Sequence, residues 1–197
     1  MVRLSMKFKT ILLFGAPGSG KGTLGKIIGT IPGFFHSACG DVFRSLNLNS
    51  RTGRIFMEYS SKGQLVPDAI TIEVWTNFIK NMVALERYKP DLDYLVLDGI
   101  PRNIRQAEML QEMLQVDYLF HLVCPDRNLI YERLRRRALK ENRFDDASDE
   151  IIAQRLATYE KESKPVLDFY PREVRYDIDA TQWPYQVLRD ILCKIKR

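Results

Sequence analysis

A glycine-rich stretch near the start of the chain carries the residues best suited to chemistry. It runs Gly15-Ala-Pro-Gly-Ser-Gly-Lys-Gly-Thr23 after the apolar run 10–14, and it reads as a strand, a tight turn and the start of a helix. Glycines let backbone N–H groups point into one concavity, and a helix that begins there adds the positive end of its dipole. This pattern is typical of a phosphate-binding loop. It predicts that the phosphates of a nucleotide are bound by Gly15, Pro17, Gly18, Ser19, Gly20, Lys21, Gly22 and Thr23.

Three side chains would give such a site its charges and its metal. Lys21 supplies a mobile positive charge for the terminal phosphates, and the hydroxyl of Thr23 would help to hold Mg²⁺, directly or through water. Asp98 ends the apolar run 94–98, a position from which a carboxylate orients Mg²⁺ and its waters. We therefore predict a magnesium site at Thr23 and Asp98. The alternative reading of Asp98 is a cap for the turn that follows it.

The elements that must position these residues alternate between strands and helices. We expect strands at 10–14, 34–37, 94–98, 118–123 and 174–178, and, after a first helix that begins near residue 20, helices at 40–48, 51–62, 67–87, 104–114, 127–140, 149–163 and 184–195. Near-continuous apolar strands between helices imply a parallel sheet covered on both faces. The prediction is a three-layer α/β/α fold with a five-stranded parallel sheet and a ligand site beyond the carboxyl ends of the strands. His36 and His121 fall within strands and are expected to be strand residues, not ligands or bases.

Composition limits the class of protein. A chain of 197 residues with 45% hydrophobic residues suits one domain with a sizeable core. Its three cysteines are far apart and form no Cys-x-x-Cys pair, so we expect no disulfide framework and no structural zinc. No apolar run reaches membrane-spanning length and the N-terminus lacks a signal-peptide pattern, so we expect a cytoplasmic protein without a membrane partner. The net charge of +5 fits either nucleic acid or a cleft for two polyphosphates.

Further segments narrow this choice. They are Gly40-Asp-Val-Phe-Arg44, Gly63-Gln-Leu-Val-Pro67, Asp98-Gly-Ile-Pro-Arg102 with Gln106, and Arg143-Phe-Asp-Asp146 with Arg155. With the glycine-rich loop they make the chain resemble the adenylate kinases and their nucleoside monophosphate kinase relatives over essentially its whole length. The resemblance implies a single kinase domain of P-loop NTPase type at 1–197, with a helical monophosphate-binding flap at 38–67 and a short lid at 137–147. It also implies a monomer that reversibly transfers the γ-phosphoryl group of Mg-ATP to AMP, giving two ADP.

The resemblance also implies roles for individual residues. The catalytic residues would be Lys21, Arg102, Arg137, Arg143, Arg155 and Asp98. ATP would be bound by the glycine-rich loop with Arg133, Arg137 and Gln182, and AMP by Cys39, Arg44, Gln64, Leu65, Val66, Gly99, Arg102, Gln106, Arg143 and Arg155. Arg133 and Arg137 are four residues apart and share a helix face. Arg135 and Arg136 are expected to point elsewhere, into solvent.

The acceptor nucleotide depends on two positions. Cys39 stands where adenylate kinases commonly have Thr and the UMP/CMP kinases have Ala, and it matches neither. Gln106 favours AMP, because a glutamine amide can accept from the amino group of adenine and donate to a ring nitrogen. A UMP/CMP kinase remains the alternative. A nucleotide-binding protein without turnover and a nucleic-acid-binding protein are the less favoured readings.

Overall fold

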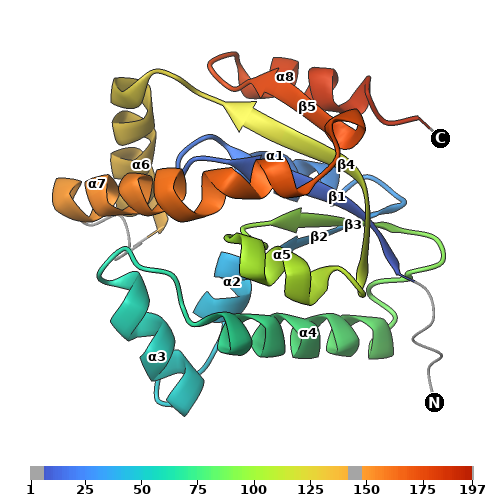
Figure 1. Cartoon of the computed structure of the whole chain (residues 1–197), viewed down its shortest axis with the longest axis horizontal. Coiled ribbons are helices and arrows are strands. Elements are labelled where there is room, and N and C mark those ends of the chain that lie inside the picture. The colour runs from blue at the N-terminus through green and yellow to red at the C-terminus, as the bar shows by residue number, and fades with distance from the viewer. Residues whose placement is uncertain (1–6, 142–147, 197) are drawn as a thin grey trace.

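A sheet of five parallel strands forms the middle layer of the molecule (Figure 1). The computed structural model describes residues 7–141 and 148–196. Along the sheet the strands run in the order β2-β3-β1-β4-β5, and every neighbouring pair is parallel. Their bounds are β1 Phe8–Gly15, β2 Phe34–Ala38, β3 Tyr94–Asp98, β4 Leu114–Val123 and β5 Arg175–Asp179. The predicted five-stranded parallel α/β fold is confirmed.

Helices connect the strands and cover the sheet. The α-helices are α1 Lys21–Ile28, α2 Cys39–Arg44, α3 Arg51–Ser60, α4 Asp68–Ala84, α5 Ile104–Leu110, α6 Arg127–Glu141, α7 Asp149–Thr158 and α8 Pro184–Leu192. A π-helical turn, η2 (Tyr159–Ser163), continues α7 and is followed by the 3₁₀ segments η3 (Lys164–Phe169) and η4 (Arg172–Val174). Helices α2 and α3 lie within the predicted flap, 38–67.

Both faces of the sheet are buried, as its near-continuous apolar strands predict. Ile11 and Leu13 of β1 belong to a cluster that includes Leu24 and Ile28 of α1 together with Val187 and Ile191 of α8. Leu12 and Phe14, which alternate with them, belong to the opposite cluster, with side chains from α4, α5 and η3. Figure 1 shows α8 on one side of the sheet and α4 and α5 on the other. This packing fixes the strand ends that carry the site.

The register of the strands brings the chemically interesting residues to one edge. Leu13 is paired with Asp98, and Ala38 is also paired with Asp98 on the other side of β3. Gly15 is paired with Leu122 near the end of β4. The glycine-rich loop, Asp98 and the turn after β4 therefore emerge side by side.

Several predicted helices end earlier than expected, among them 40–48, which ends at Arg44. The helix predicted at 104–114 ends at Leu110, because Leu114 already belongs to β4 and pairs with Phe8. The segment predicted as a helix at 149–163 is helical to Ser163, as expected, but its last turn after Thr158 is π-helical. The error at 104–114 came from a partner strand about a hundred residues away, which no local pattern reveals.

Candidate active site

The glycine-rich loop closes tightly around its own lysine. Gly15 has φ +141, and a Cβ atom there would lie only 2.6 Å from the carbonyl oxygen of Leu122, so this position needs glycine. The side chain of Lys21 turns back into the loop, where Nζ donates to the carbonyl oxygens of Gly15 at 2.8 Å and Ala16 at 2.9 Å. The ammonium group is thus buried under the loop that is predicted to bind phosphate.

Charged residues from four different elements surround this ammonium group. The pKa of Lys21 is lowered to about 8, mainly by burial. The Asp98 carboxylate acts in the opposite direction, whereas the guanidinium groups of Arg137, Arg102 and Arg155 add to the lowering. Helices α1, α6 and α7 and the end of β3 therefore bring one carboxylate and several cations together at the loop.

Most of the predicted site residues line one cavity of about 860 Å³ at this edge of the sheet. It lies between the loop, the flap, α6 and α7. Nineteen of the twenty-two predicted residues belong to its lining: Gly15, Pro17, Gly18, Ser19, Gly20, Lys21, Gly22, Thr23, Arg44, Gln64, Leu65, Val66, Asp98, Gly99, Arg102, Arg133, Arg137, Arg155 and Gln182. Arg143 lies outside the described residues. Cys39 and Gln106 are described and do not line the cavity.

Cys39 and Gln106 are buried beside the cavity. Cys39 is 2% exposed, and burial raises the pKa of its thiol to about 11, so the side chain is a neutral thiol. Gln106 is 1% exposed, and both ends of its amide are hydrogen-bonded. Its Oε1 accepts from the backbone N–H of Arg102 at 2.8 Å, and its Nε2 donates to Oδ1 of Asp68 at 2.8 Å. A carboxylate can only accept, so these partners fix the orientation of the amide.

Backbone carbonyl oxygens hold two of these arginines in place. Nε of Arg102 donates to the carbonyl oxygen of Gly99 at 2.8 Å. Gly99 has φ +76, and a Cβ atom there would lie 3.1 Å from Nη2 of Arg102. Nη1 of Arg133 donates to the carbonyl oxygen of Ala180 at 2.9 Å, which ties α6 to the turn after β5. These bonds orient the guanidinium groups without neutralising their charge.

Helix α6 presents more cations to the cavity than the sequence predicted. Arg133, Arg136, Arg137 and Lys140 all line it, because residues three and four apart share a helix face. Arg136 is exposed to solvent, as expected, but it also borders the cavity and so does not point away from the site. The same expectation for Arg135 is confirmed, since its side chain is exposed and pairs with Asp149 on α7.

The start of the π-helical turn also contributes to the cavity, which the sequence did not predict. Thr158, Tyr159 and Ser163 line it. Tyr159 lies four residues after Arg155, and this helical spacing was the available signal. Oγ1 of Thr158 donates to the carbonyl oxygen of Gly63 at 3.3 Å, so this junction also contacts the flap.

Thr23 and Asp98 offer a hydroxyl and a carboxylate to the same cavity, and oxygen donors of this kind fit Mg²⁺. A Cβ atom at Gly22 would lie 3.4 Å from Oδ2 of Asp98, so the carboxylate stands against the first turn of α1. Within residues 7–141 and 148–196, no group of three or more His, Cys, Asp or Glu side chains could hold a metal ion. The donor set suits an ion that keeps several waters and also binds substrate phosphates.

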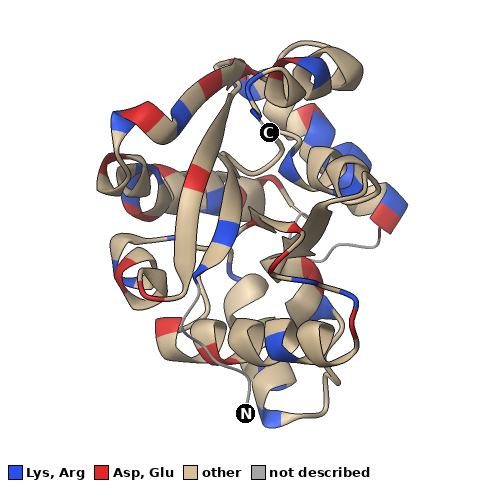
Figure 2. Ribbon diagram, turned by 90° about the vertical axis from the view of Figure 1, so that its right-hand side faces the viewer, with Lys and Arg blue, Asp and Glu red and all other residues tan. Residues whose placement is uncertain are grey.

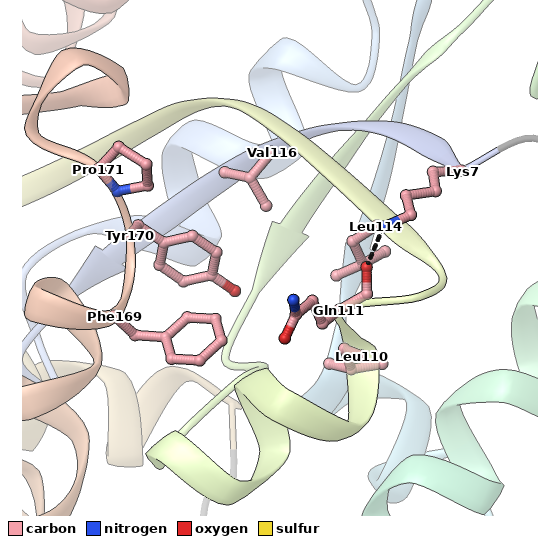
Figure 3. A pocket seen from close by; sticks show the side chains of 8 residues that line it. All are labelled: Lys7, Leu110, Gln111, Leu114, Val116, Phe169, Tyr170 and Pro171. Carbon is pink, nitrogen blue, oxygen red and sulfur yellow. Dashed lines mark hydrogen bonds between the residues drawn. The ribbon is translucent and has the colours of Figure 1, made fainter.

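A second, smaller cavity of about 420 Å³ lies away from these residues. Figure 3 shows it between Leu110 and Gln111, Leu114 and Val116 at the start of β4, and the aromatic side chains of Phe169 and Tyr170. Leu114 and Gly15 are at opposite ends of the β1–β4 pairing, so this cavity lies at the opposite ends of the strands from the glycine-rich loop. It contains none of the predicted site residues.

Comparison with known proteins agrees with this geometry. The family model described as adenylate kinase matches residues 13–175. An adenylate kinase of Porphyromonas gingivalis is 35% identical over 169 residues, covering 83% of this chain and 82% of that protein. An adenylate kinase of Bifidobacterium longum is 39% identical over 166 residues, which cover 81% of this chain and 84% of that protein. One of Mycoplasma pneumoniae is 30% identical over 202 residues, which cover 89% of this chain and 92% of that protein. In the part of the chain that the structure describes, no helix combines the length and apolar character of a membrane span. A glycine-rich loop, a convergent set of arginines and a match over most of the chain lead to one conclusion: this protein belongs to the adenylate kinase family.

Proposed function

We propose that this chain reversibly transfers the γ-phosphoryl group of Mg-ATP to AMP, with ATP on the glycine-rich loop and AMP between the flap and Arg102. The observation that carries the proposal is the convergence of Arg102, Arg137 and Arg155 on the buried ammonium group of Lys21. The family match supports the same reaction. A cavity of about 860 Å³ that reaches from the loop to the flap residues Gln64–Val66 has room for both nucleotides.

The cations address the main obstacle to this reaction. Two polyphosphates repel one another, so fixed positive groups must offset that repulsion before the acceptor oxygen can approach the γ-phosphorus in line. Phosphoryl transfer leaves little covalent chemistry for the protein, and positioning and charge stabilisation supply most of the rate. In this proposal Lys21 lies beneath the ATP phosphates, Arg44 and Arg102 hold the AMP phosphate, and Arg137 and Arg155 contact the group in transfer. A guanidinium suits this task because its planar fork matches phosphate oxygens.

Thr23 and Asp98 would hold Mg²⁺, directly or through water. Binding of Mg²⁺ there would supply positive charge to offset the negative charge of the ATP phosphates. The chain's own contribution is to orient the hydroxyl of Thr23 on the first turn of α1 and the carboxylate of Asp98 at the end of β3. We propose further that segment 38–67 moves as a flap over the monophosphate. Part of the expected lid at 137–147 lies outside the described residues.

Adenine is the acceptor base that the neighbourhood of Gln106 supports best. With Oε1 held by the Arg102 backbone and Nε2 by Asp68, the amide keeps one acceptor lone pair and one N–H. The side chain is 1% exposed and lies beside the cavity, so this proposal requires that movement of the flap uncovers the amide for the base. These match the amino group and ring nitrogen of adenine. Cys39 is a neutral buried thiol and adds bulk more than polarity. A UMP/CMP kinase is the second candidate, since Cys39 is not the threonine common in adenylate kinases.

Acceptor specificity tests the proposal. ADP formation is measured by a coupled assay with ATP and each of AMP, CMP, UMP and GMP in turn. We expect steady turnover with AMP and much slower turnover with the others. Faster turnover with CMP or UMP than with AMP would show that the acceptor is a pyrimidine nucleotide. Binding of ATP without any ADP formation would support the non-catalytic alternative.

Lys, Arg, Asp and Glu are spread over most elements of the molecule (Figure 2). The proposed reaction does not need a basic surface, because a nucleotide cleft requires only a local cluster of cations.

A further inference from the structure

A row of three hydrogen-bonded side chains runs from the edge of the sheet to the wall of the cavity. His121 of β4 lies between Asp177 of β5 and Tyr159 of η2. Its Nδ1 is 2.8 Å from Oδ1 of Asp177, and its Nε2 is 3.2 Å from the hydroxyl of Tyr159. His121 and Asp177 are directly paired in the parallel register of the two strands. The three residues therefore connect a strand at the sheet edge to a residue that lines the cavity.

The partners decide which atom carries each proton. A carboxylate only accepts, so Nδ1 of a neutral His121 carries its hydrogen toward Asp177. Nε2 then presents a lone pair, and the hydroxyl of Tyr159 donates to it. Asp177 is 75% exposed on its side chain, so its contribution is the choice of tautomer more than the strength of an ion pair. The side chain of His121 is 16% exposed, and its fixed orientation in turn orients the hydroxyl of Tyr159.

Tyr159 occupies the point where regular helix gives way to the π-helical turn. It is 8% exposed, and its ring packs on Phe14 with centroids 6.1 Å apart. Phe14 also packs on the ring of His121 at 6.2 Å. Arg155 lies one helical turn earlier, and both Arg155 and Tyr159 line the cavity. π-Helical turns are rare, and they occur frequently at functional sites.

We propose that His121, oriented by Asp177, is a positioning residue that anchors Tyr159 and so sets the direction in which α7 presents Arg155 to the phosphoryl group. This inference rests on the proposed function, because it assigns Arg155 to the group in transfer. Without the anchor the junction of α7 and η2 is held by packing on Phe14 and by the bond from Thr158 to Gly63, and it can shift. A displacement of about 1 Å at a reacting group can cost about a hundredfold in rate. The effect belongs to the transition state, so it alters kcat and leaves ground-state binding nearly unchanged.

Four variants test the inference, and three of them form a double-mutant cycle on kcat. His121→Phe keeps a ring of similar shape but removes both hydrogen bonds, and Tyr159→Phe removes only the hydroxyl. We expect each to lower kcat by about tenfold with the KM for AMP and for ATP changed less than about twofold, and we expect the double variant to lose no more than either single one. Asp177→Asn leaves the tautomer of His121 unfixed and should give an intermediate loss.

Tyr118→Phe is the matched control, because Tyr118 is on the same strand and its hydroxyl is hydrogen-bonded to the backbone of Lys196, which is not among the cavity residues. It should leave kcat unchanged even where it lowers the melting temperature. Unchanged kcat in His121→Phe, losses that multiply in the double variant, or a parallel rise in both KM values would each overturn the inference. The unaltered protein is assayed first. If it forms no ADP from ATP and AMP, the proposed function fails, which is a result distinct from failure of the anchor.

Discussion

Nζ of Lys21 donates a hydrogen bond of 2.8 Å to the carbonyl oxygen of Gly15, so the loop's cation is held by the loop's own backbone. Burial lowers its pKa to about 8. A bound polyphosphate would favour the charged ammonium and raise that pKa. We therefore predict that ATP binding takes up protons near and above pH 8, and that ATP affinity weakens as pH rises through about 8.

Calorimetry of ATP binding in buffers with different ionisation enthalpies measures this proton uptake. At pH 9 the observed enthalpy should vary with the buffer, and at pH 7 it should not. Lys21→Arg keeps a charge that does not titrate in this range and should abolish the dependence at pH 9. Equal proton uptake in the wild type and in this variant would contradict the assignment to Lys21.

Arg155 of α7 and Arg135 of α6 allow an arginine of the site to be compared with one on the surface. Arg155→Lys keeps the charge but loses the planar fork, and we predict a fall in kcat of about 100-fold or more, by comparison with arginines that stabilise phosphoryl transfer. Arg135→Lys alters an exposed pair with Asp149 and should change kcat less than about twofold. Steady-state kinetics with both nucleotides saturating measures the difference. Similar losses in the two variants would remove Arg155 from the reaction.

Gln106→Ala should weaken the binding of AMP, the acceptor, and leave the binding of ATP, the donor, nearly unchanged. Loss of a bidentate contact to a base costs about 1–3 kcal/mol, so the KM for AMP should rise by roughly 5- to 150-fold while that for ATP stays within about twofold. Gln111→Ala, at the other end of the same helix and beside the remote cavity, is the matched control and should change neither value. Equal effects of Gln106→Ala on both nucleotides would refute the base assignment.

Asp68 offers a sharper test of how that amide selects its base. Because Asp68 only accepts, it keeps Nε2 of Gln106 on its side, and a flip would turn Oε1 against the carboxylate. IMP has a carbonyl where AMP has an amino group, so it needs the flipped amide. Asp68→Asn can donate or accept, and we predict that the ratio of kcat/KM for AMP over IMP falls about fivefold, or about 1 kcal/mol. An unchanged ratio would show that Asp68 does not set the orientation.

Helix α1 and β2 approach closely enough to be tested through stability. A Cβ atom at Gly29 would lie 2.7 Å from Cβ of His36. Gly29→Ala must push the helix and strand apart, and overpacking of this kind costs about 1–3 kcal/mol. For a chain of this size we expect the melting temperature to fall by roughly 2–12 °C. Thr30→Ala, one residue later on the exposed surface, is the control. An equal or higher melting temperature for Gly29→Ala would mean that this contact relaxes without cost.

The parts of this molecule with local signals could be predicted from the sequence. The glycine-rich loop is such a signal, because its turn depends on residues adjacent in the chain. Apolar runs such as 94–98 revealed the strands, and the parallel order followed from helices between them. Leu114 was assigned to a helix because its partner, Phe8, is far away in the sequence. Contacts that depend on this pairing of distant strands cannot be predicted from the spacing of residues along the chain.

The same distinction separates what could and could not be predicted of the site. Arg137 and Arg155 were predicted on their motifs, and their roles stay predictions that the convergence on Lys21 supports. Arg136 was expected to point away from the site, but it lies three residues after Arg133, on a neighbouring part of the helix surface, and also borders the cavity. His121 was expected to be a strand residue, which is confirmed, but its contact with Tyr159 depends on how η2 packs across the sheet.

The central claim is that one cavity holds two nucleotides whose phosphates meet above Lys21. Inhibition by two adenosines joined through five phosphates tests it most directly, since this molecule spans both subsites at once. The account predicts that inhibition is competitive against ATP and also competitive against AMP, with a dissociation constant well below the KM of either. Competition with only one of the two nucleotides would contradict it, because the two subsites would then not be joined.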